Sequence, residues 1–207
     1  MPHETPVERQ TAAVWPPQTT VHAFYSGHSL SDGIPEVVAG IAAARGRTLE
    51  FEVQSIGYSL LRERTRGSST SAPWEGYRTG NNRHGAGLDV VQELQSPTRL
   101  SAGARYDTLV VTERHDLPWA AATEDTATYL ADYAGRAWAG NPDTRVFFYQ
   151  TWLGLDRANP APWIAYERDA LRLWECVASR ANQLSPVASP RIVVLPGGAI
   201  LADLVAE

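Results

Sequence analysis

The sequence has little cysteine and no long apolar run. Cys176 is the single cysteine, so no disulfide can form within the chain and no cysteine-built metal site is available. The apolar runs have the length of strands and fall short of a membrane span. Residues 1–20 are polar, contain proline, and lack the basic and apolar regions of a secretory signal. The sequence is compatible with a cytoplasmic protein and with a periplasmic or secreted protein whose signal has been removed.

An excess of basic residues is also missing. Eighteen basic residues stand against 23 acidic ones, which gives a net charge of −5. No basic patch with interleaved aromatic residues is present, so a nucleic-acid partner is not expected. No two histidines stand at metal-ligand spacing and the acidic residues are scattered, so we expect neither a metal nor a bound cofactor.

The 207 residues suffice for one domain with its own core. We expect a flexible N-terminal tail over residues 1–18 and a single domain over residues 19–207. Apolar periodicity predicts strands that alternate with helices along this domain. The expected strands are 21–25, 48–56, 106–112, 145–149 and 191–195, and the expected helices are 33–45, 88–94, 125–138, 163–184 and 199–205. This order predicts an α/β fold of three layers, α/β/α, with a flavodoxin-like parallel sheet of about five strands.

The stretch from residue 57 to 85 departs from this alternation. It is rich in Ser, Thr, Gly, Arg and Asn and has little apolar periodicity, so it is interpreted as a long excursion. Ligands of parallel sheets bind beyond the carboxyl ends of the strands. A site is therefore expected among the residues that follow the strands ending at Tyr25, Ile56, Thr112 and Tyr149.

The residues after the first expected strand read Ser26-Gly27-His28-Ser29-Leu30-Ser31-Asp32-Gly33. Gly27 permits a tight turn, and Ser29 then lies near the start of a helix, where unpaired N–H groups and the helix dipole favour negative charge. A serine in this place can attack a carbonyl while nearby N–H groups stabilise the oxyanion. The alternative is that Ser29, Ser31 and Asp32 only cap the helix. The local sequence leaves both interpretations open.

The pattern Gly27-x-Ser29-x-x-x-Gly33 resembles the first block of the SGNH, or GDSL, hydrolases, with His28 where many members carry aspartate. These enzymes have a flavodoxin-like sheet and hydrolyse or transfer esters, often on carbohydrates and lipids. The resemblance implies that Ser29 is the nucleophile of a serine esterase and that its backbone N–H is one oxyanion donor. Gly57 is similar to the glycine of the second block and would supply another N–H. The implied substrate is a small-molecule or carbohydrate ester.

The third block of the family usually contains an asparagine after the third strand, and here Glu113 stands in that stretch. An ionised carboxylate only accepts hydrogen bonds, so Glu113 could donate to an oxyanion only when protonated. Asn82, in the excursion, would supply a donor if the excursion folds back over the site. Trp152 follows the fourth strand and is interpreted as a wall of the substrate pocket, with packing of its loop as the alternative.

The last block of the family is an aspartate followed three residues later by a histidine, after the fifth strand. This sequence has no histidine after His115, so the resemblance implies that the acid–base pair is missing and that activity is weak or absent. His115, with Glu113 or Asp116 as its orienting acid, is the best candidate for a base among the remaining histidines. A surface histidine is the alternative interpretation. The resemblance also implies that the domain over residues 19–207 is truncated at its C-terminus. Loss of a terminal helix would expose apolar surface on one face of the sheet, so we expect a homodimer or a partner that covers it.

A non-catalytic binding protein is the alternative function. Ser26, Gly27, Ser29 and Ser31 form a hydroxyl-rich loop that enters a helix, which also resembles the phosphate loop of flavodoxins. Such a loop would hold a phosphate or flavin mononucleotide through its hydroxyl and N–H donors. Because bound flavin is yellow, an absorption spectrum separates the two functions.

Overall fold

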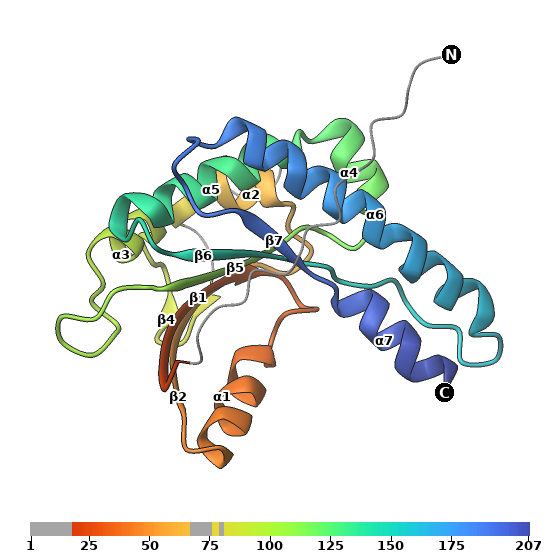
Figure 1. The fold of residues 1–207 in the computed structure, drawn as a ribbon, viewed down its shortest axis with the longest axis horizontal. Coiled ribbons are helices and arrows are strands. Elements are labelled where there is room, and N and C mark those ends of the chain that lie inside the picture. Colours follow the sequence, from red (N-terminus) through yellow and green to blue (C-terminus); the bar gives the residue numbers. More distant parts are fainter. Residues whose placement is uncertain (1–17, 67–75, 79–80) are drawn as a thin grey trace.

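The computed structural model describes residues 18–66, 76–78 and 81–207. The tail expected over residues 1–18 lies outside these ranges apart from Gln18. A seven-stranded sheet forms the centre of the molecule (Figure 1). Its strands are β1 (Thr20–Gly27), β2 (Thr48–Ser55), β3 (Asn81–Asn82), β4 (Gly85–Ala86), β5 (Thr108–Thr112), β6 (Arg145–Tyr149) and β7 (Ile192–Leu195).

Five of these strands form an all-parallel central sheet. Their order is β2-β1-β5-β6-β7, and the short strands β3 and β4 add an antiparallel hairpin beside β2. Counted along the chain, the parallel strands stand in the order 2-1-3-4-5, which is the flavodoxin-like arrangement. The expected fold class is therefore confirmed. In this arrangement the strand order reverses between β1 and β5, and ligands bind at such a switch point.

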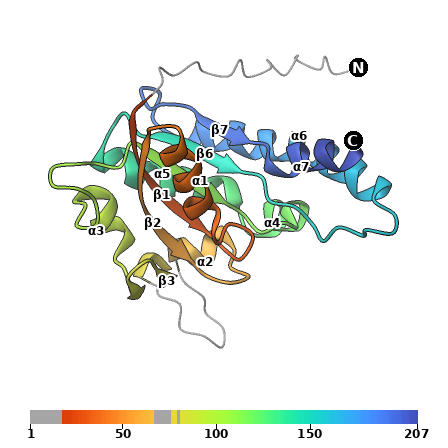
Figure 2. The same ribbon diagram turned by 90° about the horizontal axis from the view of Figure 1, so that it is seen from below.

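Helices lie on both sides of the sheet (Figures 1 and 2). They are α1 (Ile34–Ala44), α2 (Leu61–Arg66), α3 (Val90–Gln95), α4 (Leu117–Thr123), α5 (Thr126–Gly140), α6 (Ala161–Leu184) and α7 (Gly197–Ala206), with a 3-10 turn η1 (Gly76–Arg78). The two long helices α5 and α6, together with α2, α3 and α4, lie on one side, and α1 lies on the other. We call these sides the covered face and the open face of the sheet. Helix α7 lies beside α6 at the β7 edge.

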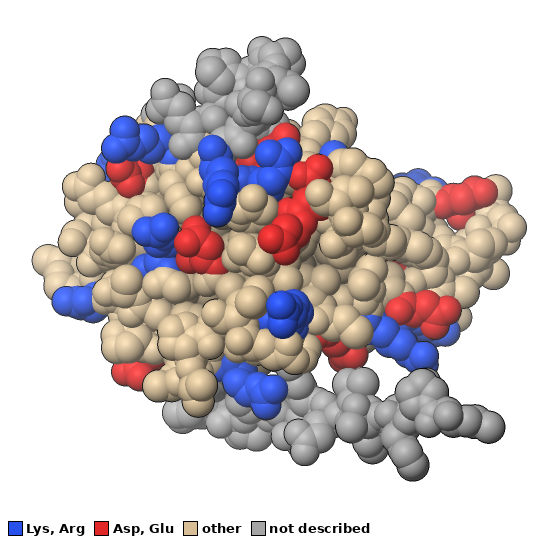
Figure 3. Space-filling model, turned by 90° about the horizontal axis from the view of Figure 1, so that it is seen from above, with Lys and Arg blue, Asp and Glu red and all other residues tan. Residues whose placement is uncertain are grey.

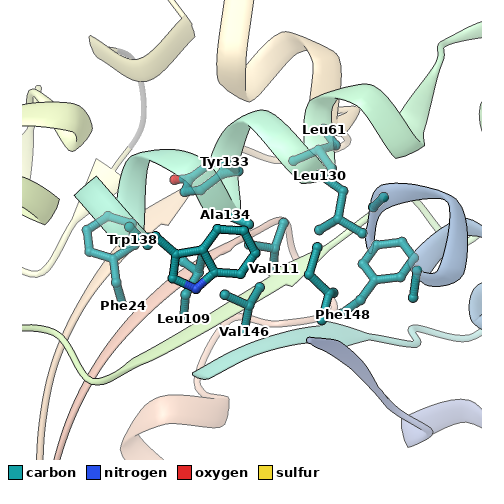
Figure 4. Close-up of a cluster of buried hydrophobic side chains, with 14 of the residues drawn as sticks. Phe24, Leu61, Leu109, Val111, Leu130, Tyr133, Ala134, Trp138, Val146 and Phe148 are labelled. Carbon is teal, nitrogen blue, oxygen red and sulfur yellow. The ribbon is translucent and has the colours of Figure 1, made fainter. Parts of the chain in front are cut away.

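The hydrophobic core lies between the covered face and helices α5 and α6 (Figure 4). Alternate residues of the central strands point into it, and Phe24, Leu109 and Phe148 have no exposed surface. Helix α5 presents Leu130 and Tyr133 at helical spacing, and both are fully buried. Each fully buried apolar side chain of this size contributes roughly 1.5–3 kcal/mol.

The open face is covered incompletely. Val110 and Phe147 point to this side from the middle of the sheet and are only half-buried. They line an apolar hollow of about 260 Å³ beside Val38 of α1. Helix α1 is apolar on almost every side, yet its one buried residue is Pro35. An apolar helix is normally covered, and the described residues cover α1 only in part.

The excursion expected over residues 57–85 holds more structure than its composition suggests. Its described part contains α2, η1 and the hairpin of β3 and β4. Helix α2 has the sequence Leu-Arg-Glu-Arg-Thr-Arg and lacks an apolar stripe, so periodicity does not reveal it. Helix α4 was also not expected, although Pro118 stands in its first turn, where proline is favoured. Seen from above in Figure 3, blue and red side chains are interspersed among the described residues of this face.

Candidate active site

The turn after β1 presents Ser29 at the surface. A side chain at Gly27 would collide with the Ser31 hydroxyl and lie 3.0 Å from Thr112 Cγ2, so only glycine fits there. The Ser31 hydroxyl closes the turn, because it donates to His28 O at 2.8 Å and accepts from His28 N at 3.1 Å. Helix α1 has Gly33 as its N-cap, without a side-chain capping bond. The exposed Ser29 is therefore not a capping residue.

Ser29 lines a hollow of about 260 Å³ at the carboxyl edge of the sheet, which we call the Ser29 hollow. Two other residues expected at the site, His115 and Trp152, line the same hollow. They come together because β1, β5 and β6 are neighbours in the sheet and their following loops meet at one edge. The remaining lining is formed by His28, Leu30, Tyr58, Arg114 and the loop residues 153–155.

The His28 ring fastens the turn of Ser29 to the end of β5. Its side chain is 1% exposed, its Nε2 lies 3.1 Å from Glu113 O, and its Nδ1 lies 3.4 Å from Leu30 N. These contacts suit a neutral ring that donates from Nε2 and accepts at Nδ1. Burial, followed by the Arg64 guanidinium, lowers the pKa of His28 to about 4. His28 is thus a neutral structural group whose ring nitrogens are both engaged.

Two backbone N–H groups, those of Ser29 and Gly57, lie just past the carboxyl ends of β1 and β2. Ile56 N donates to Gly27 O at 3.0 Å, so the residue that follows β2 is still bonded to the last residue of β1. Ser29 and Gly57 thus each follow the carboxyl end of one of two neighbouring strands by two residues. Gly57 does not itself line the Ser29 hollow. Among the described residues, neither the N–H of Ser29 nor that of Gly57 donates to a protein group. Both are therefore free to donate to a ligand.

Glu113 and Asn82 do not line the Ser29 hollow. The Glu113 carboxylate is fully buried and accepts from Leu61 N at 2.9 Å and from the Thr126 hydroxyl at 2.9 Å. Burial raises the pKa of Glu113, and the Arg64 guanidinium opposes this rise. The Asn82 side chain accepts from His84 N at 2.7 Å within the hairpin of β3 and β4. Neither side chain is offered to a ligand in the hollow.

His115 lies next to an acid that is already engaged. The Arg114 guanidinium binds both carboxylate oxygens of Asp116, at 2.6 and 2.7 Å, and lies 4.9 Å from the centre of the Trp119 ring. The hydrogen bond from Arg114 lowers the pKa of Asp116. The His115 and His28 rings pack in a T-shaped arrangement, with their centroids 6.4 Å apart. Among the described residues, no carboxylate hydrogen-bonds to the His115 ring.

A buried polar network supports the site from the covered face, and the sequence did not indicate it. Arg64 of α2 is fully buried and donates to the Ser26 hydroxyl at 3.1 Å and to Thr112 O. The Ser26 hydroxyl in turn donates to Gln54 at 2.9 Å, and Gln54 also accepts from the Tyr133 hydroxyl. Arg64 thus ties together the carboxyl ends of β1 and β5, from which Ser29 and His115 project.

The loop that carries Trp152 is fixed by buried bonds. Leu153 N donates to the Glu167 carboxylate at 2.7 Å, and Leu153 O accepts from the Trp163 indole at 2.9 Å. Gln150, which has no exposed surface, donates to Glu167 O at 2.9 Å. The Trp152 ring also lies perpendicular to the Tyr149 ring at 6.4 Å. Trp152 is therefore a firm wall of the Ser29 hollow.

The described residues show no group of three or more metal-ligating side chains. Within the same ranges, no helix combines the length and the apolar character needed to cross a membrane.

Comparison with known proteins supports the fold of this chain and assigns the chain to no family. No family model matches the chain, and no curated protein matches it. A solved DUF4886 family protein from Bacteroides uniformis superposes with a TM-score of 0.50 and 16% identity, over 84% of this chain and 66% of that one. The lipase Lip_vut3 from a goat rumen metagenome gives a TM-score of 0.35 at 12% identity, over 84% and 79% of the two chains, which is too distant to carry an argument. The chain thus shares the α/β fold of the DUF4886 protein and spans just under two thirds of that protein's chain.

Proposed function

We propose that the protein is an SGNH-like serine ester hydrolase, or acyl transferase, with Ser29 as its nucleophile. The observation that carries this proposal is the exposed Ser29 at the switch point of the sheet, in a hollow that it shares with His115. The substrate class that follows is a small-molecule ester, including one linked to a carbohydrate. The resemblance of the turn to the first SGNH block and the fold shared with the DUF4886 protein support the same function.

In this proposal, four residues at the ends of β1, β2 and β5 have separate roles. The Ser29 hydroxyl attacks the ester carbonyl and passes its proton to His115, which returns it to the departing alcohol. The N–H groups of Ser29 and Gly57 donate to the oxyanion that forms. His28 holds the turn and takes no proton, because both of its ring nitrogens are engaged. Since His115 has no hydrogen-bonded acid among the described residues, the reaction is expected to be slow.

A fluorophosphonate probe tests the nucleophile directly. We expect slow formation of one adduct per chain at Ser29, found by mass spectrometry of the digested protein. Ser29→Ala should remove the adduct, and His115→Ala should slow it further. Ser31→Ala is the matched control, because Ser31 lies in the same turn and its hydroxyl is engaged by His28. Labelling that survives Ser29→Ala, or a chain that never reacts under prolonged exposure, would refute the nucleophile.

The phosphate-binding alternative loses support from the turn itself. It relies on several hydroxyls that converge on one anion, but the Ser26 hydroxyl donates to buried Gln54 and the Ser31 hydroxyl donates to His28 O. Ser29 is the one loop hydroxyl that remains exposed among these three. A yellow protein after purification would nevertheless favour the flavin-binding function over the esterase.

A further inference from the structure

Tyr58 occupies a backbone position that disfavours tyrosine. Residues 56–59 form a turn that is closed by a hydrogen bond from Ser59 N to Ile56 O at 3.2 Å. Tyr58 has φ of 59°, in the left-handed region where glycine or asparagine is preferred. The sequence places a glycine one position earlier, at Gly57, where a Cβ would meet nothing within 4 Å. The turn therefore keeps a strained tyrosine although a glycine stands next to it.

The strained turn is anchored on its buried side and exposed to solvent on the other side. Ser59 has no exposed surface, and its hydroxyl donates to Ile56 O at 2.8 Å. The buried Arg64 donates to the Ser59 carbonyl at 2.9 Å and to its hydroxyl at 2.8 Å. The Tyr58 side chain, in contrast, is 79% exposed and so contributes little to the core. Strained residues that the surrounding structure holds in place cluster at functional sites.

The sheet order places one aromatic residue on each side of the candidate nucleophile. Tyr58 follows β2 and Trp152 follows β6, and the strands β1 and β5, which carry Ser29 and His115 at their ends, lie between them. Three strand spacings separate β2 from β6, which is about 14 Å. Both Tyr58 and Trp152 line the Ser29 hollow. A ligand at Ser29 would thus have an aromatic side chain on each flank.

We propose that Tyr58 is a specificity-determining residue that stacks on a flat ring of the substrate beside Ser29, with Trp152 as the aromatic wall on the opposite side of the hollow. This inference rests on the proposed esterase function and narrows its substrates to esters that carry a ring with an apolar face. A pyranose and an aryl ring both offer such a face, and aromatic side chains stack on it. An ester of a short linear alcohol offers none, so it should bind more weakly.

Binding is measured with the Ser29→Ala variant, so that no probe is consumed. Ligand-observed NMR titrations with phenyl acetate, acetylated methyl xylopyranoside and butyl acetate compare an aryl ring, a pyranose ring and no ring. We expect at least one ring ester to bind about tenfold more tightly than butyl acetate. Tyr58→Asn, which keeps a residue tolerated in the left-handed region, should remove this preference, and Tyr58→Phe should retain it. The tighter of the two ring esters identifies the source of the ring.

A second measurement separates a role in binding from a role in folding. Tyr58→Gly should leave the melting temperature unchanged or raise it, because it relieves the backbone, while the preference for ring esters is lost. Asp125→Gly is the matched control, since Asp125 is the other described non-glycine residue with positive φ and it lies outside the Ser29 hollow. It should relieve strain without changing ester binding.

The outcomes that contradict the inference are distinct from those that contradict the esterase. Equal binding of ring and ringless esters would overturn the role of Tyr58, as would a lower melting temperature of Tyr58→Asn with unchanged binding. Ring-selective binding by a wild-type chain that neither hydrolyses esters nor reacts with fluorophosphonate would retain the ring site and refute the nucleophile.

Discussion

Phe147 and Phe148 are consecutive residues of β6, yet they lie in two different environments. Phe148 points to the covered face, has no exposed surface and packs on the Trp174 ring at 4.5 Å. Phe147 points to the open face, is only half-buried and lines an apolar hollow beside α1. The alternation of a strand produces both environments, since successive side chains point to opposite faces. The comparison teaches that one face supplies the core, while the described residues cover the other face only in part.

The two faces also differ in how they treat polar groups near the site. On the covered face, Arg64, Gln54 and Tyr133 form a buried network under the carboxyl ends of β1 and β5. Unpaired buried polar groups are costly, so such a network holds one arrangement when all its members are bonded. The lining of the open-face hollow is mostly apolar and imposes no such arrangement. The position of Ser29 therefore depends mainly on the covered face.

The largest effect on stability is expected when each of the two phenylalanines is replaced separately by alanine. Phe148→Ala should lower the free energy of unfolding by about 3–5 kcal/mol, because it leaves a cavity in the closed core. Phe147→Ala should cost less than half as much, because Phe147 is only half-buried. Urea denaturation of both variants measures the difference. Equal losses would show that the open face is as closely packed as the core.

An intermediate effect is expected from acid, through His28. The folded-state pKa of His28 is about 4, below the ordinary value of 6.5, so the unfolded chain binds the extra proton between these pH values. The stability due to neutral His28 is complete above pH 6.5 and falls as the pH drops toward 4. The loss is on the order of 3 kcal/mol. Denaturation at a series of pH values, with His28→Asn as the comparison, should show a shallower decline in the variant. An equal decline of stability in both proteins would contradict the role of His28 in fastening the Ser29 turn to β5.

The smallest effect on stability is expected at the open face. Ile41 on α1 is 54% exposed, so Ile41→Glu should change the free energy of unfolding by no more than about 0.5 kcal/mol. We propose that a second copy of the chain covers this face, and Ile41→Glu should then shift the protein from dimer to monomer in size-exclusion chromatography with light scattering. Trp119→Glu is the control, since Trp119 is 46% exposed on α4, on the other side of the sheet. A wild-type monomer at all concentrations would refute the dimer.

Much of the fold followed from local patterns in the sequence. The five long strands and the helices α1, α5, α6 and α7 lie close to their expected ranges, because their apolar residues recur at strand or helix spacing. Helix α2 was not predicted, since one of its three buried residues, Arg64, is charged and the partners of Arg64 come from three other segments. Of the residues expected at the site, Ser29, His115 and Trp152 meet in one hollow, and the side chains of Glu113 and Asn82 lie elsewhere. Which expected residues line the hollow depends on contacts between residues distant in sequence, and local patterns do not reveal those contacts.

The sequence alone determined the alternation of strands and helices and the position of the Ser29 turn, because spacing and turn chemistry act over a few residues. The tertiary structure decided which loops meet at the switch point, that His28 turns inward, and that Tyr58 stands strained and exposed at the rim of the hollow. These features depend on strand order and on hydrogen bonds between segments dozens of residues apart, and no local pattern carries that information.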